Sequence, residues 1–330
     1  MALQLLASLR KQPPKKSAGI PPTQNDPDFV ASVPAKLAED EFLCMMQAGR
    51  YGTVAARPEK FSRHPQFREV CKAATEAIDD RFNLVPEGYA SLAMSLNDEP
   101  GCEEVDHLVE PYLLARCCVT NAEFQMFVDC GGYQNLDLWD EEIWPHLIDF
   151  KDQTDESGPR WWRKGRHDQR RADHPVVGVC NYEAAAYARW AGYRLPTEPE
   201  WQMAASWRIR SAAHVSRRYP WGDALDVRHC NIWASGLGQT QPVTSFPGGC
   251  APNGVLQLIG NVWEWTMSDF EIKAEEGRTV VGDMLMKSIR GGAFDTYFPW
   301  QATATFRSGA ICLARSHNIG IRCAMDAPKE

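Results

Sequence analysis

The sequence predicts a fold that mixes short helices with short strands and contains little regular secondary structure. Three observations predict it. From Val85 onward the chain breaks into short segments separated by Gly, Pro, Asn and Trp. Compact capped helices alternate with strand-like runs such as 175–179 and 242–246. The chain also has 12 Trp in 330 residues, a high count that suits irregular structure filled by large flat side chains.

Residues 1–34 and 35–83 differ from the rest of the chain. The first segment is rich in Pro, Lys, Ser, Asn and Asp, so we expect a flexible tail. We expect a helical appendage over 35–83, where Met45 and Met46 lie on a loose apolar stripe. We interpret that stripe as core packing rather than as a face for a partner protein. The clearer helical spacing of three and four residues joins Phe67, Val70, Cys71, Ala74, Ile78 and Phe82.

Three helices are predicted after residue 84 from their capping residues. Thr120 and Glu123 form a capping box before AEFQMFV, and Thr197 and Glu200 form a second one in LPTEPEW. Asn181 can cap the helix YEAAAYARWAG. Each of these helices is short, which is consistent with a fold that has few extended elements.

Composition excludes several classes of protein. The net charge of −8 argues against a general nucleic-acid binder. Six Arg or Lys and two Trp in 160–171 leave a nucleic-acid adaptor as a weak alternative, but eight acids in 137–156 can neutralise them. We expect no nucleic-acid partner and, since no apolar run reaches about 18 residues, no membrane association.

The order of charges at the N-terminus and the cysteine pattern indicate the compartment. An apolar run precedes the basic residues in MALQLLASLRKQPPKK, the reverse of a secretory signal. The 11 Cys include no CxxC pair and have no regular spacing, so most are interpreted as buried free thiols. We therefore predict a cytoplasmic protein.

An ordered set of motifs then points to a family. It comprises VTNAEFQMFV, DHPVVGV with NYEAAAYARWAG, YRLPTEPEW, YPWGD, CNIW, IGNVWEWTMSDF, RGGAF and HNIGIRCA. Over residues 84–326 the chain resembles the formylglycine-generating enzyme family, also called sulfatase-modifying factor domains. The resemblance implies one compact α+β domain with a C-type-lectin-like core. It does not give the function, because this fold carries several.

The resemblance implies two metal chemistries, and the sequence departs from both. Founding members oxidise a substrate cysteine to formylglycine with two copper-binding cysteines shortly after RGG, where this chain has Thr296 and Trp300 or Gln301. The ergothioneine-pathway sulfoxide synthases hold iron with three histidines of an added N-terminal bundle, whereas His64 is the sole histidine of residues 1–83. Neither copper nor iron is therefore expected.

A third branch of the family is non-catalytic and uses the lectin-like surface for binding. Our leading hypothesis is a non-catalytic domain that recognises a protein or small ligand through an aromatic surface within 294–307. At least two of Phe294, Phe298 and Phe306 are expected in the core. The predicted ligand-binding residues are Asp295, Tyr297, Trp300, Gln301 and Arg307.

The alternative hypothesis is an enzyme, a divergent formylglycine-generating or sulfur-oxidising oxidoreductase that uses Cys312 or another thiol. The missing paired thiols and histidines favour the non-catalytic hypothesis, and whether the chain is an enzyme stays open.

Calcium is the one candidate cofactor, again through the resemblance. A family site maps onto Gln257, Gly260, Val262 and Glu264, with Gln257 in place of the usual Asn. A second family site begins at the Asn-Ile of CNIW. We expect that site to be lost, because the loop ASGLGQTQPV that follows contains no Asp or Glu.

Overall fold

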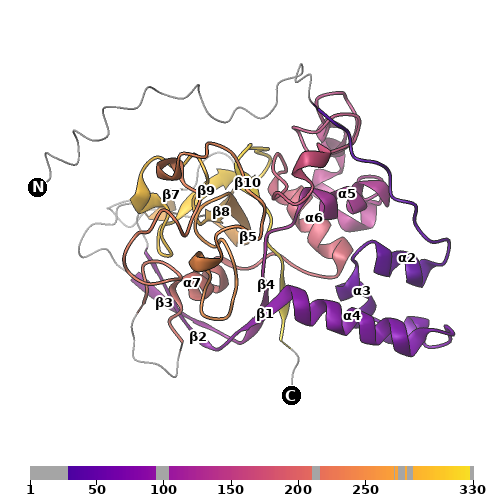
Figure 1. Cartoon of the computed structure of the whole chain (residues 1–330), viewed down its shortest axis with the longest axis horizontal. Helices are drawn as coiled ribbons and strands as arrows, with labels where there is room; N and C mark the ends of the chain where they lie inside the picture. Colours follow the sequence, from indigo (N-terminus) through magenta and orange to yellow (C-terminus); the bar gives the residue numbers. More distant parts are fainter. Residues whose placement is uncertain are drawn as a thin grey trace, which may run out of the picture.

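The computed structural model describes residues 29–93, 104–209, 216–270, 272–273, 279–280 and 285–327. Helices α2 to α6 gather on one side of the molecule, and α7 lies with most of the strands on the other (Figure 1). Most of the predicted flexible tail, residues 1–34, lies outside the described residues. Within these ranges the α-helices are α2 Glu41–Gln47, α3 Tyr51–Ala56, α4 Phe67–Arg81, α5 Asn121–Asp129, α6 Asn181–Ala191 and α7 Glu198–Ser206.

In the part of the chain that the structure describes, short strands make four small sheets. A three-stranded antiparallel sheet has the order β1-β4-β11, and a four-stranded sheet has the order β10-β5-β8-β9, in which only β10 and β5 are parallel. β2 pairs with β3, and β6 pairs with β7. The strands are β1 Phe82–Val85, β2 Gly88–Ala93, β3 Glu104–Val109, β4 Tyr112–Ala115, β5 Trp263–Asp269, β6 Ile272–Lys273, β7 Thr279–Val280, β8 Met286–Arg290, β9 Ser308–Ile311, β10 Ile319–Gly320 and β11 Ala324–Asp326.

The predicted helix caps are confirmed at two helices and displaced by one residue at the third. Both capping boxes form, at Thr120 before α5 and at Thr197 before α7. Asn181 is the first residue of α6 rather than its cap, because the N–H of Cys180 donates to Glu183 and so closes that end. The Asn181 amide donates instead to the carbonyl of Thr266 in β5, which ties α6 to the sheet.

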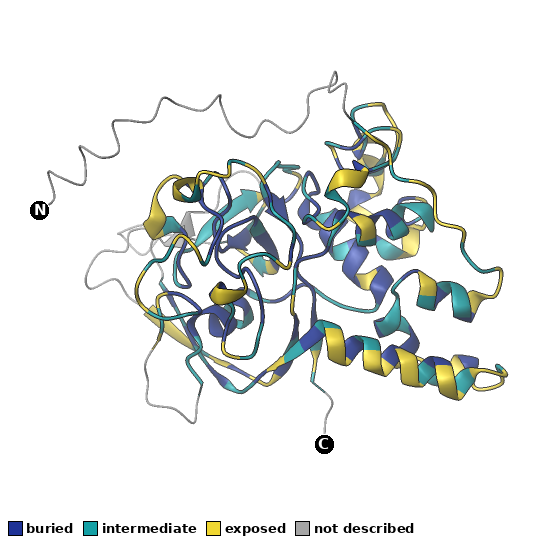
Figure 2. Cartoon of the chain, in the orientation of Figure 1, coloured by how far each residue is buried: buried dark blue, intermediate teal, exposed yellow. Residues whose placement is uncertain are grey.

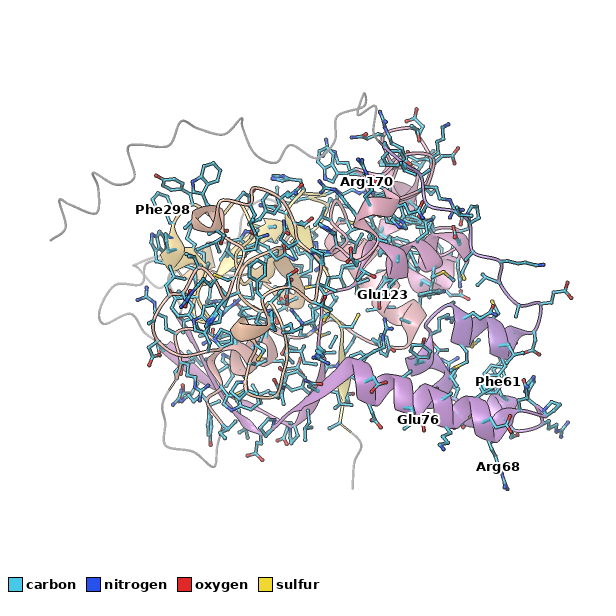
Figure 3. The ribbon with its side chains drawn as sticks, in the orientation of Figure 1. Phe61, Arg68, Glu76, Glu123, Arg170 and Phe298 are labelled. Carbon is cyan, nitrogen blue, oxygen red and sulfur yellow. The ribbon has the colours of Figure 1, made fainter. Side chains whose placement is uncertain are left out.

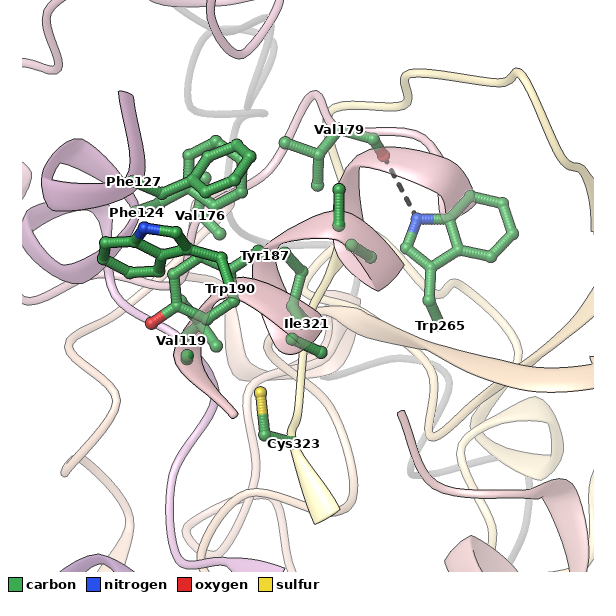
Figure 4. Close-up of a cluster of buried hydrophobic side chains, with 14 of the residues drawn as sticks. Val119, Phe124, Phe127, Val176, Val179, Tyr187, Trp190, Trp265, Ile321 and Cys323 are labelled. Atoms are coloured by element: carbon green, nitrogen blue, oxygen red, sulfur yellow. Dashed lines mark hydrogen bonds between the residues drawn. The ribbon is translucent and has the colours of Figure 1, made fainter. Parts of the chain in front are cut away.

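The main core lies between α5, α6 and β5. Phe124, Phe127 and Trp190 pack together there, and Trp265 of β5 is fully buried with its Nε1 donating to the carbonyl of Val179 at 3.1 Å (Figure 4). Trp263 lies on the same side of β5 and is only half-buried. The prediction that the tryptophans of GNVWEW are core residues therefore holds fully for Trp265 alone.

The N-terminal helices have a small apolar cluster of their own and also enter the main core. One face of α4 is buried and the other exposed (Figure 2). The Met45 side chain is buried in the small cluster, as the sequence predicts, whereas Ile78 and Phe82 belong to the main core. A Cβ on Gly192 would lie 2.0 Å from the backbone nitrogen of Thr53, so α3 packs directly on the end of α6. The division at residues 83 and 84 stays a prediction.

Removing the N-terminal helices tests that division. A chain that begins at Asn83 is expected to melt at least about 5 °C lower than the full chain. The reason is that two core side chains, each worth about 1.5–3 kcal/mol, are lost, and 1 kcal/mol shifts the midpoint by about 2–4 °C in a domain of this size. Circular dichroism melts measure this, with a chain beginning at Phe29 as the control. Equal midpoints for both truncated chains would contradict the expectation.

Candidate active site

Two glycines after β8 fix the path of the segment 290–307. Gly291 and Gly292 have φ of 100° and 77°, a backbone conformation that favours glycine. A Cβ on Gly291 would lie 2.5 Å from the carbonyl oxygen of Leu258, and one on Gly292 would lie 2.9 Å from the Cβ of Ala302. The two glycines of RGG therefore form a tight turn, which brings the backbone of the segment close to Leu258 and to Ala302.

A buried ion-pair network anchors both ends of this segment. The Arg290 guanidinium is fully buried and donates to Glu198 Oε1 at 2.8 Å, and Arg307 donates to both oxygens of Glu198 at 2.9 Å. Burial raises the pKa of Glu198, but the two guanidinium groups outweigh it, so the net pKa lies below its usual value. Arg307, a predicted ligand-binding residue, is thus placed in the anchor with 11% of its side chain exposed.

Asp295, within the segment 290–307, forms a close pair with His317, which lies after that segment in the chain. His317 Nε2 lies 2.9 Å from Asp295 Oδ2, and the Asn318 amide donates to both Asp295 oxygens at 3.1 and 3.2 Å. Burial acts to raise the pKa of Asp295, but the hydrogen bonds from His317 and Asn318 lower it below its usual value. The His317 side chain is 36% exposed, so this pair is accessible to a substrate.

The polarity of that pair makes His317 a candidate base. An Nε2–H donated to the Asp295 carboxylate leaves the lone pair on Nδ1, where it can accept a proton from a substrate. The Phe294 ring packs edge-on against the imidazole with 5.9 Å between centroids. Asp295 was predicted from the sequence, and His317 was not.

Four exposed aromatic side chains, three of them shortly after Asp295 in the chain, form a continuous series of ring contacts. We define the aromatic surface as Trp233, Tyr297, Phe298 and Trp300, which are 49%, 63%, 51% and 44% exposed. Ring centroids are 6.0 Å apart for Trp233 and Tyr297, 5.1 Å for Tyr297 and Phe298, and 6.0 Å for Phe298 and Trp300. Phe298 is labelled in Figure 3. The aromatic surface offers a ligand flat apolar contacts, and Tyr297 lies two residues along the chain from Asp295.

The aromatic surface corrects one expectation and extends another. Phe294 is buried and Phe306 is half-buried under Trp300, but Phe298 is exposed, so only one of the three is a full core residue. Proline follows Phe298 and starts a short turn of 3₁₀-helix that holds the ring outward. The sequence analysis did not name Trp233 as a binding residue, although Trp233 ends the CNIW motif. The backbone N–H of Trp233 donates to the carbonyl of Thr296 and so brings it to the segment 290–307.

The family's two cysteine positions carry no thiol and are structural here. The Thr296 hydroxyl accepts a hydrogen bond from the N–H of Ala293 and is buried. Gln301 is half-buried, and its N–H donates to the carbonyl of Phe298. Cys312, the thiol named in the enzymatic alternative, is only 3% exposed, and burial raises its pKa, which disfavours the reactive thiolate.

Three of the four predicted calcium ligands already have partners within the protein. Both Glu264 oxygens accept from Arg322, at 2.8 and 2.6 Å, and Oε2 also accepts from Trp201 Nε1 at 2.7 Å. Gln257 Oε1 accepts from Asn261 at 2.7 Å, and the carbonyl of Gly260 accepts from the N–H of Val262 at 2.9 Å. Arg322 thus supplies the positive charge that an ion would bring, and this arrangement does not fit calcium. Calcium binding stays a prediction.

The described residues, taken by themselves, do not supply the ligands of a copper or iron centre. Across them, no group of three or more His, Cys, Asp or Glu side chains lies close enough together to hold a metal ion. No step is therefore assigned to a metal at the His317 pair. No helix within the described ranges is long and apolar enough to cross a membrane, and the cytoplasmic location stays a prediction.

Comparison with known proteins decides the family. Residues 66–327 match the sulfatase-modifying factor enzyme 1-like domain. The chain belongs to this family. The match covers more than half of the chain, and it includes α4 as well as the whole region predicted from the motifs. A solved structure titled PvdO from Pseudomonas aeruginosa has a TM-score of 0.50 at 20% identity and covers 74% of this chain and 94% of its own. That likeness supports the fold alone, and the predicted α+β C-type-lectin-like class is confirmed.

Two sulfatase-modifying-factor relatives carry names of enzymes. Hercynine oxygenase of Mycobacterium tuberculosis is 38% identical over 185 residues, which are 53% of this chain and 41% of that protein. Formylglycine-generating enzyme of Streptomyces coelicolor is 34% identical over 258 residues, 66% of this chain and 79% of that protein. This chain therefore spans less than half of the hercynine oxygenase and most of the formylglycine-generating enzyme.

These relatives overturn two expectations from the sequence. The hypothesis of a non-catalytic binding domain is wrong, because the matched relatives are an oxygenase and a formylglycine-generating enzyme. The expectation of neither copper nor iron is also wrong, because oxygenases draw on metals or organic cofactors for dioxygen chemistry. Both errors came from treating the missing ligands of one segment as evidence about the whole protein.

Proposed function

We propose that this chain is an oxidoreductase domain that acts on a sulfur-bearing substrate held at His317, Asp295 and the aromatic surface. The observation that carries the proposal is the match of residues 66–327 to a family whose relatives include hercynine oxygenase and formylglycine-generating enzyme. A thiol substrate follows from the family's founding chemistry, the oxidation of a cysteine.

The proposed site divides the work between two groups of residues. The aromatic surface binds the flat or apolar part of the substrate and excludes water from one side of it. His317 removes the thiol proton, because the thiolate is the form that is readily oxidised, and a free thiol has a pKa of about 8.5. Asp295 orients the imidazole through its contact with Nε2. Activation of dioxygen requires a metal or an organic cofactor. The described residues contain no cluster of three or more His, Cys, Asp or Glu side chains that would hold a metal ion.

Oxygen consumption tests the proposal directly. The purified chain is incubated aerobically with a cysteine-containing peptide and, in separate reactions, with copper(I) or iron(II). We expect oxygen uptake above the same metal without protein, together with an aldehyde or an added oxygen atom on the peptide by mass spectrometry. If neither uptake nor product exceeds the protein-free reactions with either metal, the proposed function is wrong.

Trp300 should matter for substrate binding and little for folding. We expect Trp300→Ala to raise KM for the peptide by roughly thirtyfold, which corresponds to about 2 kcal/mol of lost contact, because the ring is 44% exposed and free to contact substrate. The thermal midpoint should change by less than about 4 °C. Trp144→Ala is the matched control, since Trp144 is 42% exposed and lies outside the aromatic surface. Equal KM values for the two variants would remove Trp300 from the site.

A further inference from the structure

A cavity lies where the end of α4, the start of β1 and the end of β4 meet α5, α6 and the loop 243–256. Its volume is about 500 Å³, within the range of about 300–1,000 Å³ typical of small-molecule sites. None of its lining residues belongs to the aromatic surface or to the His317 pair, and no function has been attached to it so far.

The inner wall of this cavity is apolar and uncharged. Val119, Tyr187 and Cys323 line it and are drawn in Figure 4 at the edge of the main core. Phe82 and Leu256 also line it, and each is 5% exposed. Burial raises the pKa of Cys323 to about 12, so its thiol stays neutral and the wall carries no charge there. Such a wall favours the apolar body of a ligand.

The exposed part of the cavity lining carries Asp80, Arg81, Arg116 and Glu123. Arg81 ends α4 and Arg116 follows β4, and the N–H of Arg116 donates to the carbonyl of Arg81. Glu123 neutralises Arg81 in an ion pair. Arg116 is exposed and forms no ion pair with any described residue. Its guanidinium is therefore available to an anion at the cavity.

We infer that this cavity binds a small apolar carboxylic acid, with its hydrocarbon part against Phe82, Val119 and Leu256 and its carboxylate at Arg116. An apolar cavity closed by a guanidinium matches the two chemical parts of such a molecule. The site is separate from the proposed active site, so it holds whether or not the chain is an oxidoreductase.

Two thiols at the cavity provide built-in reporters of occupancy. Cys117 and Cys250 line the cavity and are partly exposed, whereas Cys44 and Cys71 are partly exposed elsewhere, on α2 and α4. The full-length chain is treated with N-ethylmaleimide with and without decanoate, and the modification rate of each cysteine is followed by peptide mass spectrometry. Decanoate should slow modification at Cys117 and Cys250 at least fivefold and leave Cys44 and Cys71 unchanged.

Variants separate the two parts of the ligand. Arg116→Gln should raise the decanoate concentration for half-protection at least about threefold, with no change for the uncharged decanol. Arg68→Gln is the matched control, because Arg68 is exposed on α4 and absent from the cavity lining (Figure 3). Cys250→Trp should fill the cavity and abolish protection of Cys117.

Calorimetric titration of decanoate into the full-length chain gives an independent measure of binding, with a negative heat-capacity change expected from buried apolar surface. The inference is overturned if titration detects no binding, if all four cysteines are protected equally, or if Arg116→Gln affects decanoate and decanol alike. Loss of oxygen consumption in the separate test would leave these results unaffected, so the two proposals fail independently.

Discussion

Glu264→Ala is expected to lower the free energy of unfolding by about 3–5 kcal/mol, because it leaves a buried charge without its partner. Glu264 and Arg322 are both fully buried and are joined by hydrogen bonds of 2.8 and 2.6 Å. The substitution also removes the acceptor for Trp201 Nε1 and for the Cys118 thiol. Urea unfolding followed by tryptophan fluorescence measures the loss.

The controls separate the buried pair from other causes. Glu76→Ala breaks an exposed ion pair with Lys72 on α4 and should change stability by less than about 1 kcal/mol. The double change Glu264→Leu and Arg322→Met should recover part of the loss, since no charge is then left unpaired. Glu264→Ala should lower the free energy of unfolding by the same amount in a buffer with EDTA and in a buffer with calcium. The reason is that the charge left without a partner is the guanidinium of Arg322, not a calcium ion. A cost that appears only in calcium would instead support the predicted calcium site.

His317→Ala is expected to reduce kcat for oxygen consumption about 10²–10⁴-fold, the usual contribution of a positioned base. The prediction rests on the proposed function and on the 2.9 Å contact with Asp295. The thermal midpoint should change little, because the imidazole is 36% exposed. Steady-state oxygen uptake with the cysteine-containing peptide measures kcat, and a melt of the same sample shows that the variant is folded.

Two further variants test whether the imidazole acts as a base. His146→Ala changes an exposed histidine far along the chain and should leave kcat unchanged. Asp295→Asn should also lower kcat, because its amide can donate to Nε2 and so leave the proton on Nδ1, the wrong tautomer for a base. A wild-type kcat in His317→Ala would assign the proton transfer to another group.

Local signals in the sequence predicted local structure well. The boxes at Thr120 and Thr197 form as expected, because each involves residues only three apart along the chain. The family motifs also gave the fold class. They did not give the cap of α6, because the amide of Asn181 is recruited by Thr266 of β5, a contact between distant segments.

The sequence names members of the proposed site only where they adjoin the RGG motif, and their role in binding stays a prediction. Asp295, Tyr297 and Trp300 follow that motif directly, so sequence alone brought them together. Trp233 and His317 join them through contacts that no local pattern encodes, a backbone hydrogen bond to Thr296 and the pairing with Asp295.

The same limit explains Arg307 and the calcium set. The role of Arg307 depends on Glu198, 109 residues earlier in the chain. Glu264 is likewise matched to Arg322, 58 residues later, and the spacing within GNVWEW gives no sign of that partner. In both cases the sequence identifies a chemical group, and the tertiary contact decides what it does.

The order of the sheet β1-β4-β11 also constrains how the chain can fold during synthesis. β4 is flanked by β1 on one edge and by β11 on the other, with Leu114 opposite Asn83 and Ala324. A ribosome releases β1 and β4 long before β11, so this sheet stays incomplete until residues 324–326 have emerged. Pairings of such high contact order fold slowly, and the open edge of β4 is vulnerable to association with other chains in the meantime. More than 200 residues of synthesis therefore separate the first pair of strands from the completed sheet.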